Sequence, residues 1–157
     1  MNMVEEGQAA PDFELATDNG EIVKLSQLHG RKVVVYFYPK DDTSGCTKEA
    51  IAYSELADRF TSIDVEVIGI SPDSVDSHQK FKAKHGLNIR LAADEEKAAA
   101  EAYGVWVEKK MYGRTFLGVE RSTFLIGPDG AIAKVWRKVK VPGHAEAVLE
   151  TANSLDA

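Results

Sequence analysis

This chain of 157 residues contains a single cysteine, Cys46, and lacks several features that mark other classes of protein. One cysteine cannot form an intramolecular disulfide, so a disulfide-stapled secreted fold is excluded and a reducing compartment is favoured. No apolar run approaches the roughly 18 residues that a membrane span requires, and no glycine-rich phosphate motif is present. The net charge of −6 gives no electrostatic case for nucleic-acid binding.

The composition, with 44% hydrophobic and 28% charged residues, is typical of a soluble globular protein. We therefore expect one domain over residues 1–157. Residues 1–7 lack the basic and apolar regions of a signal peptide, so we expect the protein to be cytoplasmic, with no membrane contact. The basic stretch at 137–140 is expected to be a solvated strand edge.

The first half of the chain predicts an N-terminal β-extension followed by a βαβ unit. Asn19-Gly20 marks a tight turn between two short strands. The unbroken apolar run 33–38 predicts a central strand. A helix over roughly 44–60 and a strand over 65–70 follow, so the two strands should pair in parallel through a right-handed crossover.

The second half is predicted from its turn and capping residues. A helix near 95–103 has Asp94 as its cap, and Pro128-Asp129-Gly130 marks the turn of an antiparallel hairpin. The expected elements are helix 74–85 with its stop at Gly86, helix 95–103, strand 114–126, a hairpin of 121–126 with 131–137, and helix 144–154. This order is that of an α/β thioredoxin-like fold, with a central mixed β-sheet flanked by helices and an N-terminal β-extension.

Cys46 follows the strand 33–38 through a turn and lies in the first turn of the predicted helix. Backbone N–H groups and the helix dipole favour a negative thiolate there. Thr43, three residues before the thiol, is a suitable N-cap residue. A small buried structural cysteine is the other interpretation, and the local context leaves both open.

The residues permit one-thiol chemistry. Thr43 stands where a C-x-x-C redox pair would need a second cysteine, so dithiol exchange by this chain alone is not possible. A nearby cation would stabilise the thiolate. Arg121, at the start of an apolar strand, is the best candidate, and Arg114 and Arg137 are alternatives. An ordinary exposed arginine is the competing interpretation.

No metal or cofactor is expected. His78 and His85 lie seven residues apart on one predicted helix, but a zinc site needs further ligands that we cannot place. Four aromatic residues are expected to be core or pocket walls rather than a cofactor platform: Tyr103, Trp106, Tyr112 and Trp136.

The segment around Cys46 resembles the active site of peroxiredoxins. Residues 39–46 read Pro-Lys-Asp-Asp-Thr-Ser-Gly-Cys, which matches the pattern Pro-x-x-x-Thr/Ser-x-x-Cys. The flanking residues are similar to the bacterioferritin comigratory protein branch, also called peroxiredoxin Q. Three later segments are similar to the same branch: 103–106, 120–126 and 141–144. The resemblance covers almost the whole chain.

This resemblance implies a cofactor-free thiol-dependent peroxidase that reduces hydrogen peroxide and organic hydroperoxides. Cys46 would be the nucleophile that becomes a sulfenic acid. Thr43 would hydrogen-bond the reacting oxygens, and Arg121 would stabilise the shifting charge. Pro39 would shield the sulfur from water. Glu49 resembles the acidic residue that orients the arginine, although an exposed first-turn glutamate favoured by the helix dipole is an equal alternative.

Two positions depart from this branch. Ser44 stands where the branch often has Pro, which should only loosen the turn. Ile51 stands where many members carry a resolving cysteine, and helix 74–85, where other members carry it, has none. Ile51 is also expected on the apolar side of its helix.

A one-cysteine form follows from these departures. Its oxidised thiol must be reduced by an external thiol of the thioredoxin or glutathione/glutaredoxin type. A peroxide sensor or redox relay, which passes oxidation to a partner protein, is the alternative function. The branch implies a monomer or a weak homodimer.

Overall fold

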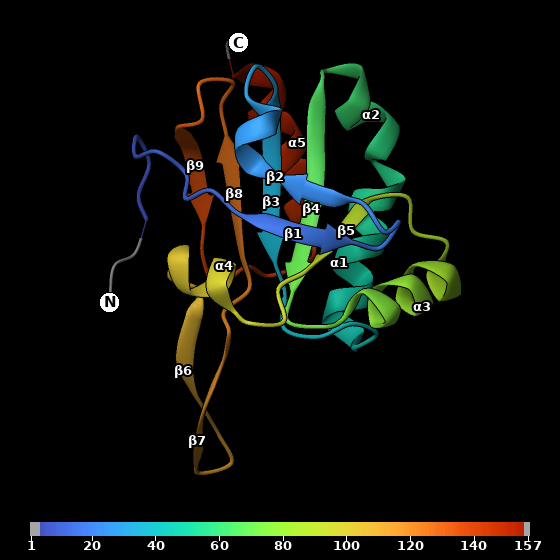
Figure 1. The fold of residues 1–157 in the computed structure, drawn as a ribbon, viewed down its shortest axis with the longest axis vertical. Coiled ribbons are helices and arrows are strands. Elements are labelled where there is room, and N and C mark those ends of the chain that lie inside the picture. The colour runs from blue at the N-terminus through green and yellow to red at the C-terminus, as the bar shows by residue number, and fades with distance from the viewer. Residues whose placement is uncertain (1–3, 156–157) are drawn as a thin grey trace.

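The computed structural model describes residues 4–155, which form a mixed seven-stranded sheet with helices on both faces (Figure 1). The strand order is β2-β1-β5-β4-β3-β8-β9. The strands of this sheet are β1 Glu14–Thr17, β2 Ile22–Lys24, β3 Lys32–Phe37, β4 Val65–Ser71, β5 Arg90–Ala93, β8 Ser122–Ile126 and β9 Ile132–Trp136. The helices are η1 Leu25–Leu28, α1 Ser44–Glu55, α2 Ala57–Ser62, α3 Val75–His85, α4 Ala98–Ala102 and α5 His144–Ser154.

Strand β3 is central, as its apolar run predicts, and it is buried on both faces. Its side chains alternate between two hydrophobic clusters because successive residues of a strand point to opposite faces. Val34 and Tyr36 join the cluster that contains residues of α1, α3 and α5. Val33 and Val35 join the cluster that contains residues of η1 and α4. The sheet therefore separates two cores.

The predicted topology around β3 is confirmed. Strands β3 and β4 pair in parallel, with Val35 opposite Ile68, and α1 and α2 form the crossover. Strand β8 pairs with β3 in the antiparallel sense, and β9 completes the predicted hairpin. At the N-terminus, β1 and β2 pair around Gly20, whose φ of +83° is the left-handed conformation that a tight turn requires. The mixed sheet and β-extension of the thioredoxin-like fold are present.

The helix expected over 44–60 is divided into two helices at Leu56, whose φ and ψ are −97° and 2°. No Gly or Pro marks this break in the sequence. The predicted apolar face still packs inward, since Ala50, Tyr53 and Phe60 are buried and Ala57 lies against the same core. The repeating apolar pattern therefore indicated the packing correctly and the helix length incorrectly.

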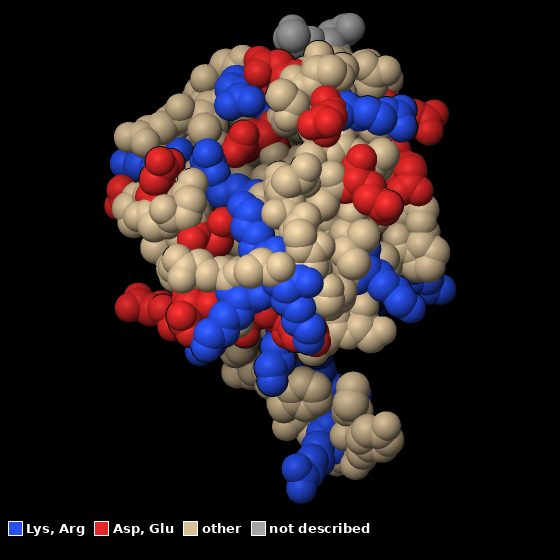
Figure 2. Space-filling view, turned by 90° about the vertical axis from the view of Figure 1, so that its right-hand side faces the viewer, with Lys and Arg blue, Asp and Glu red and all other residues tan. Residues whose placement is uncertain are grey.

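The single strand expected over 114–126 is wrong. The chain forms β7 Arg114–Val119 and then β8, which belong to different sheets. Strand β6 Trp106–Met111 pairs with β7 in a separate hairpin that projects from the body (Figure 1). Figure 2 shows this hairpin as a lobe at the lower end of the molecule. Tyr112 at its tip is 96% exposed, so it is not a core residue.

Two further boundaries differ from expectation. Helix α4 is shorter than 95–103, although the carboxylate of Asp94 does accept hydrogen bonds from the backbone of Ala99 and Ala100 near the start of the helix. Strand β9 ends at Trp136, and Arg137 is half-buried, with its guanidinium over the ring of Phe124. The expectation of a solvated strand edge is therefore wrong for Arg137.

The helices expected at 74–85 and 144–154 are confirmed as α3 and α5. Gly86 ends α3 with a φ of +63°, the left-handed conformation that a C-terminal cap favours. None of the helices described between residues 4 and 155 has the length and apolar character to span a membrane.

Candidate active site

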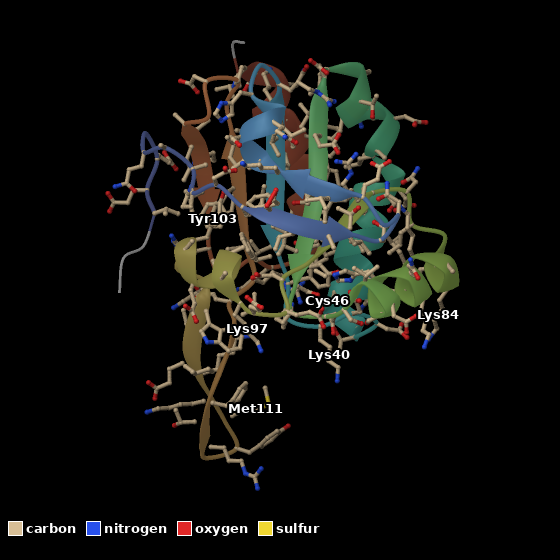
Figure 3. The ribbon with its side chains drawn as sticks, viewed as in Figure 1. Lys40, Cys46, Lys84, Lys97, Tyr103 and Met111 are labelled. Atoms are coloured by element: carbon tan, nitrogen blue, oxygen red, sulfur yellow. The ribbon has the colours of Figure 1, made fainter. Side chains whose placement is uncertain are left out.

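Cys46 is the third residue of α1 and lies at the end of the sheet where β3 finishes (Figure 3). Strand β8 runs antiparallel to β3, and Ser122 at its start lies opposite Phe37 at the end of β3. Arg121, the residue before β8, is therefore brought to the same sheet end as the helix that carries the cysteine. Topology alone places a cation beside a thiol 75 positions away in the chain.

The guanidinium of Arg121 joins Cys46 and Glu49. Its Nη2 donates to the Sγ of Cys46 at 3.3 Å, and its Nη1 donates to Oε1 of Glu49 at 2.6 Å. Cys46 and Glu49 are three residues apart on α1, so they lie on one face of the helix. Both are only 1% exposed, and the Arg121 side chain is 17% exposed. The interpretations of Arg121 and Glu49 as exposed residues are wrong.

Burial sets the electrostatics of this triad. Desolvation raises the pKa of Glu49 to about 7, although the positive charge and hydrogen bond of Arg121 oppose that rise. Partial burial disfavours the charged guanidinium, but the charges of Glu49 and Cys46 outweigh it and raise the pKa of Arg121. Arg121 is therefore a fixed positive charge that contacts the sulfur in a largely dry site.

Gly45 makes room for this contact. A Cβ on Gly45 would lie 3.2 Å from Nη2 of Arg121, closer than most real contacts of that kind. Gly45 was not predicted from the sequence to be a site residue. The sequence does carry one signal for it, a glycine inside the first turn of a predicted helix. Because glycine has a poor helix propensity, its presence there indicates that a larger side chain would clash with a neighbour.

Thr43 occupies the N-cap position of α1 but its side chain makes no cap hydrogen bond. Its hydroxyl instead donates to the carbonyl oxygen of Lys40 at 2.8 Å. With its hydrogen used in this way, the exposed hydroxyl oxygen can accept a hydrogen bond from a ligand. Pro39 is half-buried and directly follows the buried Tyr38, where the chain leaves the sheet.

A buried polar cluster beside the site was not predicted from the sequence. The carboxylate of Asp41 accepts hydrogen bonds from the hydroxyls of Tyr38 and Ser77 at 2.6 and 2.8 Å. Its Oδ2 lies 2.7 Å from Nδ1 of His78. We call these four residues the Asp41 cluster. From the sequence, His78 was a candidate only as a metal ligand, because nothing in the local pattern shows that α3 packs against the turn 39–43.

The remaining candidates lie elsewhere. Arg114 is exposed on the projecting hairpin, and Arg137 donates to the carbonyl oxygen of Val4. His85 pairs with Asp42 on the surface. Ile51 is 36% exposed, so its expected place on the apolar side of the helix is wrong. Within residues 4–155 no group of three or more His, Cys, Asp or Glu side chains could hold a metal ion.

Comparisons with known proteins agree with this geometry. Residues 6–135 match the model of the AhpC/TSA family. The chain is 49% identical to peroxiredoxin Bcp of Bacillus subtilis over 97% of both chains. It is 40% identical to peroxiredoxin Bcp of Escherichia coli K12 over 95% of this chain and 96% of that protein.

Solved structures show the same relationship. The bacterioferritin comigratory protein of Xanthomonas campestris superposes with a TM-score of 0.89 at 40% identity, over 96% of this chain and 98% of that one. A PrxQ variant of Xylella fastidiosa superposes with a TM-score of 0.92 at 39% identity, over 98% of both chains. The chain therefore belongs to the AhpC/TSA family, in its Bcp or peroxiredoxin Q branch.

Proposed function

We propose that this thiol-dependent peroxidase reduces hydrogen peroxide and organic hydroperoxides at Cys46. The observation that carries the assignment is the hydrogen bond of 3.3 Å from Arg121 to the sulfur of the single cysteine. A structural cysteine needs no partly buried guanidinium beside it, whereas a reactive thiolate is held by an adjacent cation and a helix N-terminus. The X. campestris relative was studied for its alkyl peroxide reduction activity.

In the first step, the Cys46 thiolate attacks the terminal oxygen of the peroxide. The S–O bond forms as the O–O bond breaks, so the sulfur is oxidised to a sulfenic acid and the peroxide is reduced. The attacked oxygen keeps its hydrogen in the sulfenic acid, and the leaving oxygen takes a proton from the solvent and departs as water or an alcohol. Negative charge moves from sulfur to that oxygen, and the fixed charge of Arg121 stabilises it along the way.

The other site residues orient this reaction. The hydroxyl oxygen of Thr43 accepts a hydrogen bond from the peroxide O–H, since its own hydrogen is donated to the backbone. Glu49 holds the arginine in place through its bond of 2.6 Å. We assign to Pro39 the role of covering the sulfur from water, in line with the 1% exposure of Cys46.

The second step needs another molecule. Two external thiols reduce the sulfenic acid back to the thiol, releasing water and leaving their own disulfide. The chain has no second cysteine to take part in it. We propose a reductant of the thioredoxin or glutathione/glutaredoxin type, a monomer or weak homodimer, and a reducing, cytoplasmic environment.

The same missing cysteine favours one other candidate function, a sensor or relay. There Cys46 would pass its oxidation to a partner protein as a mixed disulfide. Stopped-flow peroxide reduction with thioredoxin, glutathione with glutaredoxin, and dithiothreitol separates the two functions. Efficient recycling by any of them supports the peroxidase, and slow recycling by all supports the relay.

The test of the assignment is to move the thiol. Cys46→Ser should abolish rapid peroxide consumption. A matched control combines Cys46→Ser with Ser154→Cys, which places the one thiol at an exposed position away from Arg121. We expect that control to react no faster than a free thiol in solution. Rapid consumption by Cys46→Ser would show that Cys46 is not the reacting group, and rapid consumption by the double variant would show that the surroundings of Cys46, Arg121 included, do not activate the thiol.

A further inference from the structure

We propose that Asp41 and His78 are positioning residues of this active site. They fix the turn 39–43, which carries Thr43 and leads into the helix that holds Cys46, onto helix α3. The inference rests on the proposed function of Cys46, because it concerns the geometry in which that thiol reacts. Neither residue touches the sulfur or the arginine in the contacts described above.

Asp41 is the centre of the Asp41 cluster. Its side chain is 4% exposed and that of His78 is 0% exposed. The carboxylate accepts from Tyr38, the last buried residue before the turn, and from Ser77 on α3. With the contact of 2.7 Å to His78, it joins the end of the sheet, the turn and α3. A buried carboxylate is stable only when its hydrogen bonds are satisfied in this way.

Two hydrogen-bond contacts fix the orientation of the His78 ring. The Nε2 of His78 lies 3.0 Å from the carbonyl oxygen of Ala92, which can only accept, so Nε2 carries a hydrogen. The Nδ1 lies 2.7 Å from a carboxylate oxygen, which also needs a hydrogen between the two atoms. The imidazole ring thus bridges the turn to strand β5 through two hydrogen bonds, and it cannot rotate without losing both.

Further contacts restrain the turn on either side of this cluster. The backbone N–H of Asp41 donates to Oδ2 of Asp73, ahead of α3, at 2.8 Å. Asp42 has a φ of +59°, a conformation that a residue other than glycine keeps only when its surroundings fix it. Its carboxylate pairs with Lys84 at 2.7 Å and His85 at 2.8 Å. Helix α3 therefore holds two successive residues of the turn.

The position of the turn sets the start of α1. The carbonyl of Thr43 accepts the first hydrogen bond of that helix from the N–H of Thr47. Cys46 lies between these two residues, and its buried sulfur must stay aligned with Arg121 and with the hydroxyl of Thr43. A misplacement of about 1 Å from a remote change can cost about a hundredfold in rate. If the turn is released from α3, Cys46 should therefore react more slowly with peroxide, and its thiol should become more exposed.

The test compares Asp41→Ala with Asp41→Asn. Two rates are measured for each: single-turnover oxidation by hydrogen peroxide, and alkylation of the only cysteine by a bulky maleimide. For Asp41→Ala we expect oxidation to slow by about tenfold and alkylation to accelerate by about tenfold. Asparagine can accept from Tyr38 and donate to Nδ1 of His78 with no shared proton. We therefore expect Asp41→Asn to stay within about threefold of the wild type in both rates.

The matched control is Lys82→Met, also on α3. It breaks the bond of 2.8 Å from Lys82 to Asp18, a partly buried contact that does not involve the turn. We expect both rates to remain at wild-type values. Equal changes in Lys82→Met and Asp41→Ala, or wild-type rates in Asp41→Ala, would overturn the proposal. Changed alkylation in a protein that never consumes peroxide would support the positioning role and reject the peroxidase function.

A milder variant covers the case in which Asp41→Ala does not fold, as judged by circular dichroism. Ser77→Ala removes one of the three side-chain hydrogen bonds to the carboxylate of Asp41. We expect about threefold slower oxidation and about threefold faster alkylation, with an intact fold. No change in either rate for this variant would contradict the proposal.

Discussion

Glu49 is an almost fully buried carboxylate that is held by Arg121 through one oxygen only. Oε1 accepts from Nη1 of the arginine at 2.6 Å, and Oε2 has no hydrogen-bond partner among the described residues. A buried carboxylate with one unsatisfied oxygen is costly to ionise. The pair therefore orients the guanidinium toward Cys46 at a cost in stability, which can be measured.

The first prediction concerns the pH dependence of stability. The pKa of Glu49 rises from 4.5 in the unfolded chain to about 7 in the folded protein, because burial disfavours its charge. Between these values the folded state binds the extra proton, so the free energy of unfolding falls as pH rises from 4.5 to 7. The loss from this group is about 3 kcal/mol and is complete above pH 7.

Denaturant unfolding of the wild type and Glu49→Gln from pH 4 to 8 tests this. Glutamine keeps an acceptor for Arg121 but cannot ionise, so the variant should gain stability relative to the wild type across that pH window. Taking the difference between the two proteins removes the contribution of other groups, such as His144, whose pKa burial and Arg121 lower to about 4. A difference that is flat with pH would mean that Glu49 ionises normally.

The second prediction concerns Gly45. A Cβ at this position would press on Nη2 of Arg121 from 3.2 Å, and the flexible end of the arginine can retreat by a few tenths of an ångström. We expect Gly45→Ala to slow peroxide oxidation of Cys46 by about threefold to tenfold. Alanine has a higher helix propensity than glycine, so the variant should also gain up to about 1 kcal/mol in stability.

Stopped-flow oxidation and thermal unfolding of the same variant check both parts. Ser44→Ala, one residue earlier on the exposed side of the helix start, is the control for helix propensity. It should leave the oxidation rate unchanged. A rate loss of equal size in Ser44→Ala would show that the contact between Gly45 and Arg121 is not responsible.

Much of this site could be predicted from the sequence because its signals are local. The run 33–38 and the turn before Cys46 predict a thiol at a helix start, and the resemblance to peroxiredoxins points to Arg121. The Asp41 cluster depends instead on α3 packing against the turn, a tertiary contact 37 residues apart that no local pattern encodes. The break at Leu56 likewise has no Gly or Pro signal.

The third prediction concerns the packing beneath the site. Tyr36 on β3 lies opposite Gly69 on β4, and a Cβ on Gly69 would be 2.7 Å from the ring's Cζ. The ring cannot retreat, because it stacks on Tyr53 with centroids 4.5 Å apart. Gly69→Ala should therefore destabilise the protein by about 1–3 kcal/mol through overpacking. The Tyr36 hydroxyl is buried without a hydrogen-bond partner among the described residues, so the reference for the double variant is Tyr36→Phe alone. Relative to that reference, Gly69→Ala should still destabilise the protein, since Cζ stays in place; no loss of stability would assign the clash to the hydroxyl alone.

The last prediction asks whether α1 can open at its start. Residues 46 and 51 are five apart on one helix, so they are separated by about 7.5 Å along the axis and lie on different faces. A disulfide needs Cα atoms closer than about 7 Å with converging side chains, so the first turn must unwind before the two sulfurs can meet. Ile51 is exposed enough that Ile51→Cys should cost little stability.

We expect the Ile51→Cys variant, after one equivalent of peroxide, to lose two hydrogens in intact-mass spectrometry. The wild type should instead gain one oxygen. The step from the sulfenic acid to the disulfide should be faster when Asp41→Ala is added, because the turn 39–43 no longer holds the start of α1 against α3, although the sulfenic acid itself forms more slowly in that variant. The matched control is Ser54→Cys, on the same helix. A cysteine at position 54 is too far from Cys46 to form a disulfide after a single turn unwinds, so this variant should retain the added oxygen. A sulfenic acid that persists in Ile51→Cys would mean that the start of α1 does not open.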